Sequence, residues 1–176
     1  IGKSPSRFDF KILQNLSSKH IAAASNAALL QDITNYQSAI AAPPFTDAQL
    51  QELDTAMYCL KERAKTLPEL LEKARFILQT RPISIDEPAQ ATLDSVFIGI
   101  LQSLTPQLQN ATWNREHLEV LFHEFVGSNG IKFGQLAAPL RAALAGRKAT
   151  PSVYDMMVLL GRDETIARIK DAIAES

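Results

Sequence analysis

Apolar residues recur every three or four positions along most of this chain of 176 residues, which is the spacing of amphipathic helices. Thr46 with Gln49 forms a predicted capping box in front of one such segment. Asn114 marks the beginning of another helix, and Gly130 marks its end. No segment alternates apolar and polar residues over more than a few positions, as a half-buried strand would. We therefore predict an all-α, multihelical protein.

Further helix beginnings follow from capping residues. They are predicted at Thr66 with Glu69, at Asp86, at Thr150 followed by Pro151, and at Asp163. Asp86 is expected to cap a helix that continues through Leu104. Thr150 is expected to cap a helix that continues to Gly161.

The predicted helices fall into three parts. Helical spacing over 9–24 and 26–41 ends at two consecutive prolines, which cannot continue a helix. The three parts are a helical stump at 1–42, a small helical bundle at 45–105 and a second small bundle at 106–176.

Neither a catalytic residue nor a metal site is predicted from the residues alone. Cys59 is the single cysteine, which excludes a disulfide framework and a cysteine-rich zinc site. His117 and His123 are six positions apart, so a helix places them on different faces. No glycine-rich phosphate loop and no motif for a nucleophilic serine occur. We therefore expect that the chain itself is not an enzyme and binds no cofactor.

No run of residues is apolar enough for a membrane span or a signal peptide. We therefore expect a cytoplasmic monomer without a membrane partner. Because the chain begins at Ile1 and not at methionine, we also expect it to be a part of a longer protein.

Charge is nearly balanced in sum but uneven along the chain. Eighteen basic and nineteen acidic side chains give a net charge of −1. Residues 61–81 hold six bases and three acids, residues 125–154 hold four bases and no acid, and residues 82–131 hold six acids and one base. Such segregation can form a surface for a polyanion. The alternative is a helical protein-interaction scaffold with no nucleic-acid role, in which these charges are merely solvated.

Two long stretches resemble the C-terminal half of bacterial-type, class I glutamyl-tRNA synthetases. The first is LKERAKTLPELLEKARF at 60–76, followed by RPISID at 81–86. The second is GIKFGQLAAPLRAALAGRKATPSVYDMMVLLGRDETIARI at 130–169, preceded by WNREHLEVL at 113–121. The opening SPSRFDF at 4–10 is similar to the end of the family's stem-contact region. The resemblance implies that the two predicted bundles bind the anticodon and that the catalytic domain is absent.

The resemblance also implies a function. The parent enzyme would be a glutamate–tRNA ligase that activates glutamate with ATP and Mg²⁺ and attaches it to tRNA-Glu. This part would bind the anticodon loop and position the tRNA, with neither cofactor of its own. Whether the parent also charges tRNA-Gln is left open by the sequence.

The resemblance assigns anticodon contacts to particular residues. Arg141 matches the family's anticodon-contacting arginine, and a guanidinium suits this task because it pairs with base edges and stacks on base faces. Thr150 and Pro151 match the positions where a helix beginning meets a base or a phosphate, and Val153 matches an apolar family position that packs on a base. Arg63 matches the arginine that reads the third anticodon base, with Arg81 as the rival.

Other bases are expected to contact phosphates. They are Lys61, Lys65, Arg147 and Lys148. Ala138 departs from the family pattern, because family members usually carry a glutamine there whose amide can reach a base edge. Ser152 stands where glycine is common. Trp113 is expected to anchor the core, with a stacking platform for a base as the alternative.

Overall fold

The structure is a computed structural model in which residues 18–175 are described. Within this range every regular element is a helix, so the all-α prediction is confirmed. The chain forms two compact units, one ending at Leu78 and one beginning at Gln79. The predicted helix over 9–24 is described only from Ser18 onward, and its earlier part lies outside the described residues. None of the described helices is long and apolar enough to cross a membrane.

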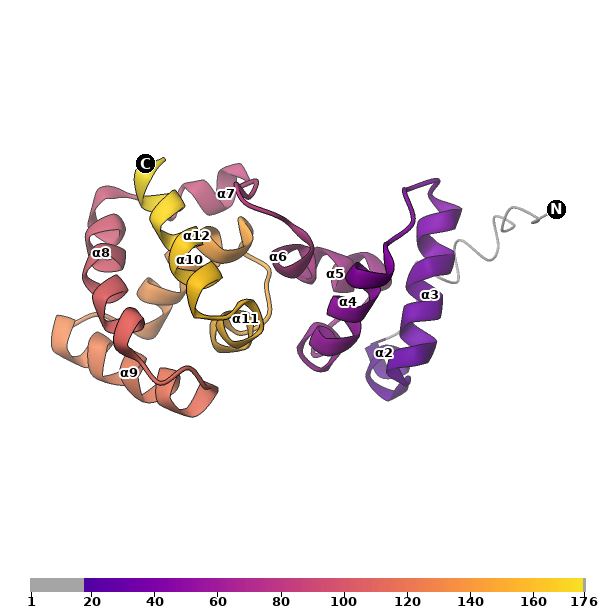
Figure 1. The fold of residues 1–176 in the computed structure, drawn as a ribbon, viewed down its shortest axis with the longest axis horizontal. Coiled ribbons are helices and arrows are strands. Elements are labelled where there is room, and N and C mark those ends of the chain that lie inside the picture. The colour runs from indigo at the N-terminus through magenta and orange to yellow at the C-terminus, as the bar shows by residue number, and fades with distance from the viewer. Residues whose placement is uncertain (1–17, 176) are drawn as a thin grey trace. The chain divides into compact units, whose positions relative to one another are not determined.

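The first unit consists of short helices that pack against one another. The described ones are α2 (Ser18–Ala23), α3 (Asn26–Ala39), α4 (Asp47–Leu60), α5 (Leu67–Lys73) and α6 (Arg75–Leu78). Helix α3 contacts α4 and α5, and α4 also contacts α6 (Figure 1). Their apolar stripes bury Leu29, Ile33, Leu53 and Met57 completely. Because helices this short are marginal alone, this shared burial stabilises them.

The predicted capping box at Thr46 is confirmed. The Thr46 hydroxyl accepts a hydrogen bond from the Gln49 N–H at 3.2 Å, and the Gln49 side chain accepts one from the Thr46 N–H at 2.9 Å. Thr66 caps α5 in a similar way, accepting from the Glu69 N–H at 3.2 Å. The Glu69 carboxylate accepts from the N–H of Lys65 at 2.8 Å, one residue before the cap. It thereby fastens the end of the loop that precedes α5.

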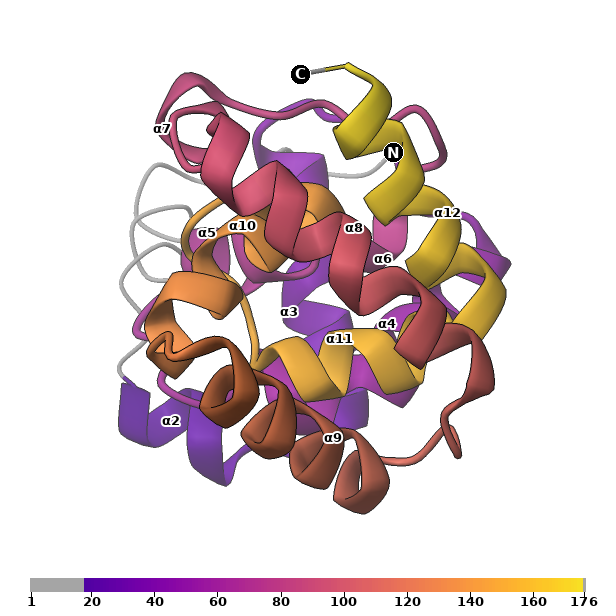
Figure 2. The same ribbon diagram turned by 90° about the vertical axis from the view of Figure 1, so that its left-hand side faces the viewer.

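The second unit is arranged around one central helix. Its helices are α7 (Glu87–Gln90), α8 (Ser95–Asn110), α9 (Arg115–Asn129), α10 (Phe133–Ala145), α11 (Val153–Leu160) and α12 (Arg162–Ala174). Helices α8, α10 and α12 contact one another, and α11 contacts α9, α10 and α12 (Figure 2). Eight of the 13 residues of α10 are buried. Helix α10 is therefore the centre of this unit.

Asp86 caps a helix as predicted, but that helix is short. Its carboxylate accepts a hydrogen bond at the beginning of α7, which is a single turn. The predicted continuation through Leu104 is wrong, because the carboxylate of Asp94 forms a second N-cap and begins α8. Asn114 and Gly130 bound α9 as predicted, with Gly130 in the left-handed region at a φ of 62°.

The beginnings of the last two helices differ from prediction. Ser152, and not Thr150, is the N-cap of α11. The Thr150 hydroxyl instead donates to the carbonyl of Pro151 at 2.8 Å, so it does not cap the helix. Helix α12 begins at Arg162, which places Asp163 in the first turn and not at the cap. There the helix dipole still favours its negative charge.

The compact units divide the chain at a different place from the predicted bundles. The predicted boundary between 45–105 and 106–176 falls inside α8, whose packing partners are α10 and α12. Helices α7 and α8 therefore belong to the second unit, since their apolar faces are covered there. The assignment of 1–42 to a stem-contact region, and of the two later ranges to anticodon binding, stays a prediction.

Candidate nucleic-acid interface

Arg141 is the single charged residue of α10 and lies one turn before the helix ends at Ala145. Its neighbours Leu140 and Leu144 are in the core, whereas Arg141 is half-buried at the edge of the helix. Within residues 18–175, the Arg141 guanidinium forms no hydrogen bond and no ion pair. A planar set of donors without a protein partner is available to a ligand.

Helix α10 ends at Gly146, whose φ of 69° lies in the left-handed region. A side chain does not fit at this position, because a Cβ on Gly146 would lie 2.0 Å from the carbonyl oxygen of Ser84. The close approach lets the Asp86 N–H donate to the Gly146 carbonyl at 3.0 Å. Gly146 thus holds the segment 79–86, here called the strap, against the end of α10.

Arg147 fastens the strap to the same helix end. Its guanidinium donates to the carbonyls of Gly146 at 2.7 Å and Ser84 at 3.0 Å, and its Nε lies 3.6 Å from the Asp86 carboxylate. Only 13% of its side chain is exposed. Arg147 is therefore occupied by structural contacts, and its predicted phosphate contact would compete with them.

A buried arginine of α12 binds both the end of α10 and the beginning of the strap. Arg168 is 3% exposed, and its guanidinium donates to the Leu144 carbonyl at 2.7 Å and to the Gln79 carbonyl at 3.0 Å. Its Nε also donates to the Glu164 carboxylate at 2.8 Å. The last carbonyls of a helix lack partners within the helix. Arg168 therefore satisfies one of them at the end of α10 and also fixes the first residue of the strap.

The loop 147–152 and the first residue of α11 carry the other predicted contacts of the second unit. Lys148 is exposed, and its ammonium group has no partner in the part of the chain that the structure describes. Thr150 is half-buried, and its oxygen can still accept a hydrogen bond while its proton is donated to Pro151. Pro151 is buried, and Val153 is only 1% exposed. The side chain of Val153 is therefore not exposed enough to make the predicted contact with a base.

In the first unit, the loop between α4 and α5 carries the predicted cations. Arg63 is exposed, and its φ of 59° lies in the left-handed region. Neither its guanidinium nor the ammonium group of Lys65 has a hydrogen bond or an ion pair with the described residues. Lys61 differs, because its ammonium group donates to the carbonyl of Ala24 at 3.3 Å. Arg63 and Lys65 are thus the available cations of this loop.

The backbone conformation of Arg63 gives a first prediction. Arg63→Gly should be more stable than Arg63→Ala by about 1 kcal/mol. Both variants lose the guanidinium, but only glycine adopts a φ of 59° without steric cost. Urea unfolding of the two variants, followed by helical circular dichroism, measures the difference. Two variants of equal stability would show that no backbone strain is stored at this position.

Arg81, the rival for reading the third base, is engaged in an ion pair. Its Nε and Nη2 donate to the two carboxylate oxygens of Asp171 at 2.7 and 2.8 Å. These hydrogen bonds raise the pKa of Arg81 and lower the pKa of Asp171. The ion pair engages Nε and one N–H of Nη2, so a base edge read by this side of the guanidinium would have to break it. Because the Arg63 guanidinium is unpaired within the described range, we favour Arg63 for this role.

Trp113 has the contacts of a packing residue. Its indole N–H donates to the carbonyl of Met157 at 2.9 Å, and the guanidinium of Arg162 lies 5.6 Å from its ring centre. These contacts are typical of a packing residue, and they favour the predicted core anchor over a stacking platform for Trp113. The sequence interpretation missed the structural roles of Arg162 and Arg168. For Arg168 the signal was its place on the apolar face of α12, one position before buried Ile169.

The family of the chain follows from comparison with known proteins. Residues 18–173 match the family model described as an anticodon binding domain. Since this match covers most of the chain, the protein belongs to the family of anticodon-binding domains. Its all-α, multihelical fold agrees with that class of domain.

The relatives of the chain are glutamate–tRNA ligases. The chain is 60% identical over 172 residues to "Glutamate--tRNA ligase 2" of Ruegeria pomeroyi, covering 98% of this chain and 37% of that protein. It is 55% identical over 174 residues to "Glutamate--tRNA ligase 2" of Cereibacter sphaeroides, covering 99% and 37%. A crystal structure of a glutamate tRNA ligase from Elizabethkingia meningosepticum has the same fold, with a TM-score of 0.68 at 24% identity over 90% of this chain and 31% of that one. The resemblance to glutamyl-tRNA synthetases is confirmed, and the chain spans about 37% of the length of these curated relatives.

Proposed function

We propose that this chain is the tRNA-binding part of a glutamate–tRNA ligase and that it recognises the anticodon loop of tRNA-Glu. The observation that carries the proposal is the guanidinium of Arg141, unpaired within the described residues, in a chain that matches the anticodon-binding family. Arg63 in the first unit is a second such group. Each of the two lies in one of the base-rich segments of the sequence.

Recognition would follow from the chemistry of these cations. Unstacked anticodon bases present hydrogen-bonding edges and flat faces. Arg141 would donate parallel hydrogen bonds to one base edge or stack on its ring, and Arg63 would read the third anticodon base. Lys65 and Lys148 have exposed ammonium groups that would neutralise phosphates.

The chemistry of aminoacylation is assigned to the remainder of the parent protein. Within residues 18–175, no group of three or more His, Cys, Asp or Glu side chains is arranged to hold a metal ion. The sequence also lacks a glycine-rich phosphate loop. The remainder of the ligase would bind ATP, Mg²⁺ and glutamate, and this part would position the tRNA.

Arg141→Ala is expected to weaken binding of tRNA-Glu by about 1–3 kcal/mol, the loss typical of an arginine that contacts a base edge. Fluorescence anisotropy with labelled tRNA-Glu measures the Kd of the wild type and the variant. Both titrations need one fixed salt concentration, because phosphate contacts make the affinity salt-dependent.

Two controls separate base reading from simple charge attraction. Arg141→Lys keeps the charge but loses the planar fork, so it should bind nearly as weakly as Arg141→Ala. A tRNA-Glu with an altered anticodon should bind the wild type less tightly, while the variants, which keep Arg63, should discriminate less between the two tRNAs. Equal affinity of the wild type for both tRNAs would overturn anticodon recognition and favour the protein-interaction scaffold. A parallel titration with tRNA-Gln shows whether that tRNA is also accepted.

A further inference from the structure

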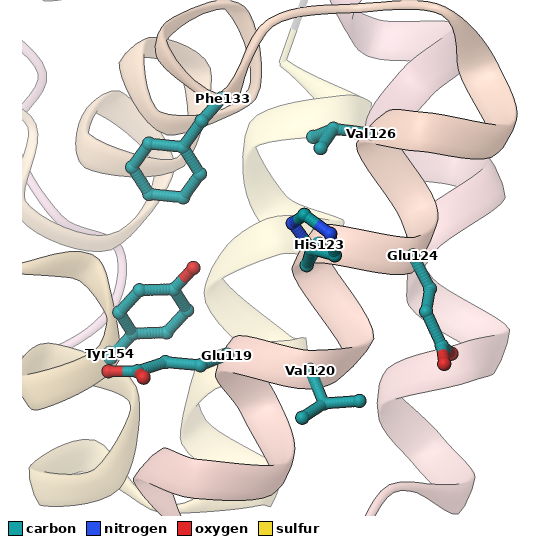
Figure 3. Close-up of a pocket in the computed structure, with 7 residues that line it drawn as sticks. All are labelled: Glu119, Val120, His123, Glu124, Val126, Phe133 and Tyr154. Atoms are coloured by element: carbon teal, nitrogen blue, oxygen red, sulfur yellow. The ribbon is translucent and has the colours of Figure 1, made fainter.

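A pocket of about 530 Å³ opens between α9 and the beginnings of α10 and α11 (Figure 3). Its apolar lining consists of Val120 and Val126 of α9, Phe133 of α10 and Tyr154 of α11. Val120 is 54% exposed and Phe133 is 40% exposed, although burial of either apolar side chain would be energetically favourable. A concave place with an apolar lining is the kind of surface in which a protein binds an apolar group. We call this site the α9 pocket.

The aromatic wall of the α9 pocket is fixed by the core beneath it. The rings of Phe133 and Tyr154 are stacked with their centres 5.8 Å apart, and the Tyr154 ring also lies 5.3 Å from the ring of buried Phe122. The guanidinium of Arg115 lies 5.7 Å from the centre of the Tyr154 ring. The wall is therefore formed in advance, and an occupant does not have to order it.

The Tyr154 hydroxyl is a polar group within this wall. It forms no hydrogen bond with the described residues, and Figure 3 shows it directed into the space between Phe133 and His123. Burial and the charge of Glu119 raise the pKa of Tyr154, so the hydroxyl keeps its proton. It is therefore available to donate a hydrogen bond to a backbone carbonyl of an occupant.

The rim of the α9 pocket is acidic. Glu119 and Glu124 line it together with His123, and no lysine or arginine is among its lining residues. Arg115, the only arginine of α9, is held by the carboxylates of Glu119 at 2.7 Å and Asp155 at 2.6 Å. One guanidinium shared by two carboxylates neutralises only part of their charge, and Glu124 adds a further negative charge, so the surroundings of the pocket stay net negative. An RNA phosphate would be repelled here, whereas a lysine or arginine side chain would be attracted.

We propose that the α9 pocket docks a partner protein, which fills it with an apolar side chain from a segment flanked by lysine or arginine. An amphipathic helix presents this pattern at three- and four-residue spacing. The apolar wall would supply the affinity, and the acidic rim would select a basic segment over an acidic one. The proposal goes beyond tRNA binding, because no residue of the pocket is among the candidate RNA contacts.

Selection from a library of random peptides displayed on phage tests the proposal. The library is selected on the wild-type chain and counter-selected on Val120→Lys, which places a positive charge on an exposed valine of the pocket. Val96→Lys is the matched control, since Val96 is an even more exposed valine of α8 outside the pocket. Enriched peptides should combine an apolar anchor with neighbouring lysine or arginine. The proposal is overturned if no peptide is enriched on the wild type over Val120→Lys, or if the enriched peptides are acidic.

Titration of the most enriched peptide, made synthetically, gives the size of the effect. Val120→Lys should weaken its binding at least about tenfold, as truncation of a central contact does, and Val96→Lys should leave it unchanged within about twofold. Glu124→Lys, which reverses a rim charge at an exposed position, should weaken it as well. Unfolding curves for each variant verify that the fold is kept. Equal binding by Val120→Lys and Val96→Lys would contradict the proposal.

Other occupants of the α9 pocket would give different experimental results. Self-association of the chain that is lost in Val120→Lys would assign the pocket to a second copy and overturn the proposal. Displacement of the peptide by single-stranded RNA would assign it to RNA and also overturn it. The affinity for tRNA-Glu should be the same in Val120→Lys and the wild type. A failure of the docking proposal is thus seen separately from a failure of the tRNA proposal.

Discussion

Arg168→Ala is expected to lower the free energy of unfolding of the second unit by about 3–5 kcal/mol. The buried guanidinium donates to the carbonyls of Leu144 and Gln79. Its removal leaves both oxygens without that donor, at about 1–3 kcal/mol each, and also removes the aliphatic stem from the core. Glu164, the third partner, is partly exposed, so its charge regains water and adds little to the loss.

The fluorescence of Trp113 reports this unfolding, because Trp113 is the single tryptophan and lies in the second unit. Urea unfolding followed by this signal isolates the second unit from the first. Lys170→Ala is the control, since Lys170 is exposed on the same helix and should change the stability by no more than about 0.5 kcal/mol. A loss below about 1 kcal/mol in Arg168→Ala would mean that water replaces the guanidinium at both carbonyls.

Gly146→Ala is expected to lower the free energy of unfolding of the second unit by about 2–4 kcal/mol. The left-handed φ of 69° is costly for alanine, and the new Cβ would lie 2.0 Å from the carbonyl oxygen of Ser84. Because this neighbour is backbone, the strap itself must move. That movement breaks the 3.0 Å hydrogen bond from the Asp86 N–H and displaces the contacts of Arg147.

The same change should also weaken tRNA binding, since Arg141 lies one turn before Gly146 and the loop with Lys148 follows it. Gly134→Ala is the matched control, because it lies in the same helix and no heavy atom lies within 4 Å of the added Cβ. It should keep the stability or raise it by up to about 1 kcal/mol, as alanine favours a helix over glycine. Trp113 fluorescence again gives the unfolding midpoints. Equal midpoints for the two variants would show that the strap is not held against α10 in solution.

Arg168 and Gly146 both hold the backbone of the candidate interface in place. The proposed base contact, Arg141, lies on a helix end that Gly146, Arg147 and Arg168 fasten to the strap and to α12. A side chain distinguishes one base from another only when its backbone is held in place, because a mobile donor would follow either base edge. Around this helix end, Arg147 and Arg168 hold the structure, whereas Arg141 is the arginine proposed to contact the ligand.

The helices were predictable because their signals are local. The capping box at Thr46 and the boundaries of α9 depend on hydrogen bonds between residues three or four positions apart. The beginnings of α8 and α11 were not. Asp86 caps only the single turn of α7, and Asp94, eight positions later, caps the separate helix α8. At α11, Thr150 and Ser152 are two capping residues only two positions apart, and Ser152 is the one that caps the helix.

The sequence by itself determined the all-α fold, the family resemblance and the two base-rich segments that contain the candidate contacts. It distinguished the cations of those segments only through the family resemblance. The tertiary structure separated them: Arg81 is paired with Asp171, 90 positions away, and Arg147 donates to Ser84, 63 positions away, while Arg141 has no partner within residues 18–175. The physical reason is the separation along the sequence between the residues that interact. A helix is specified by hydrogen bonds along a few neighbouring residues, whereas the partner of a charged side chain is set by which distant segments pack together.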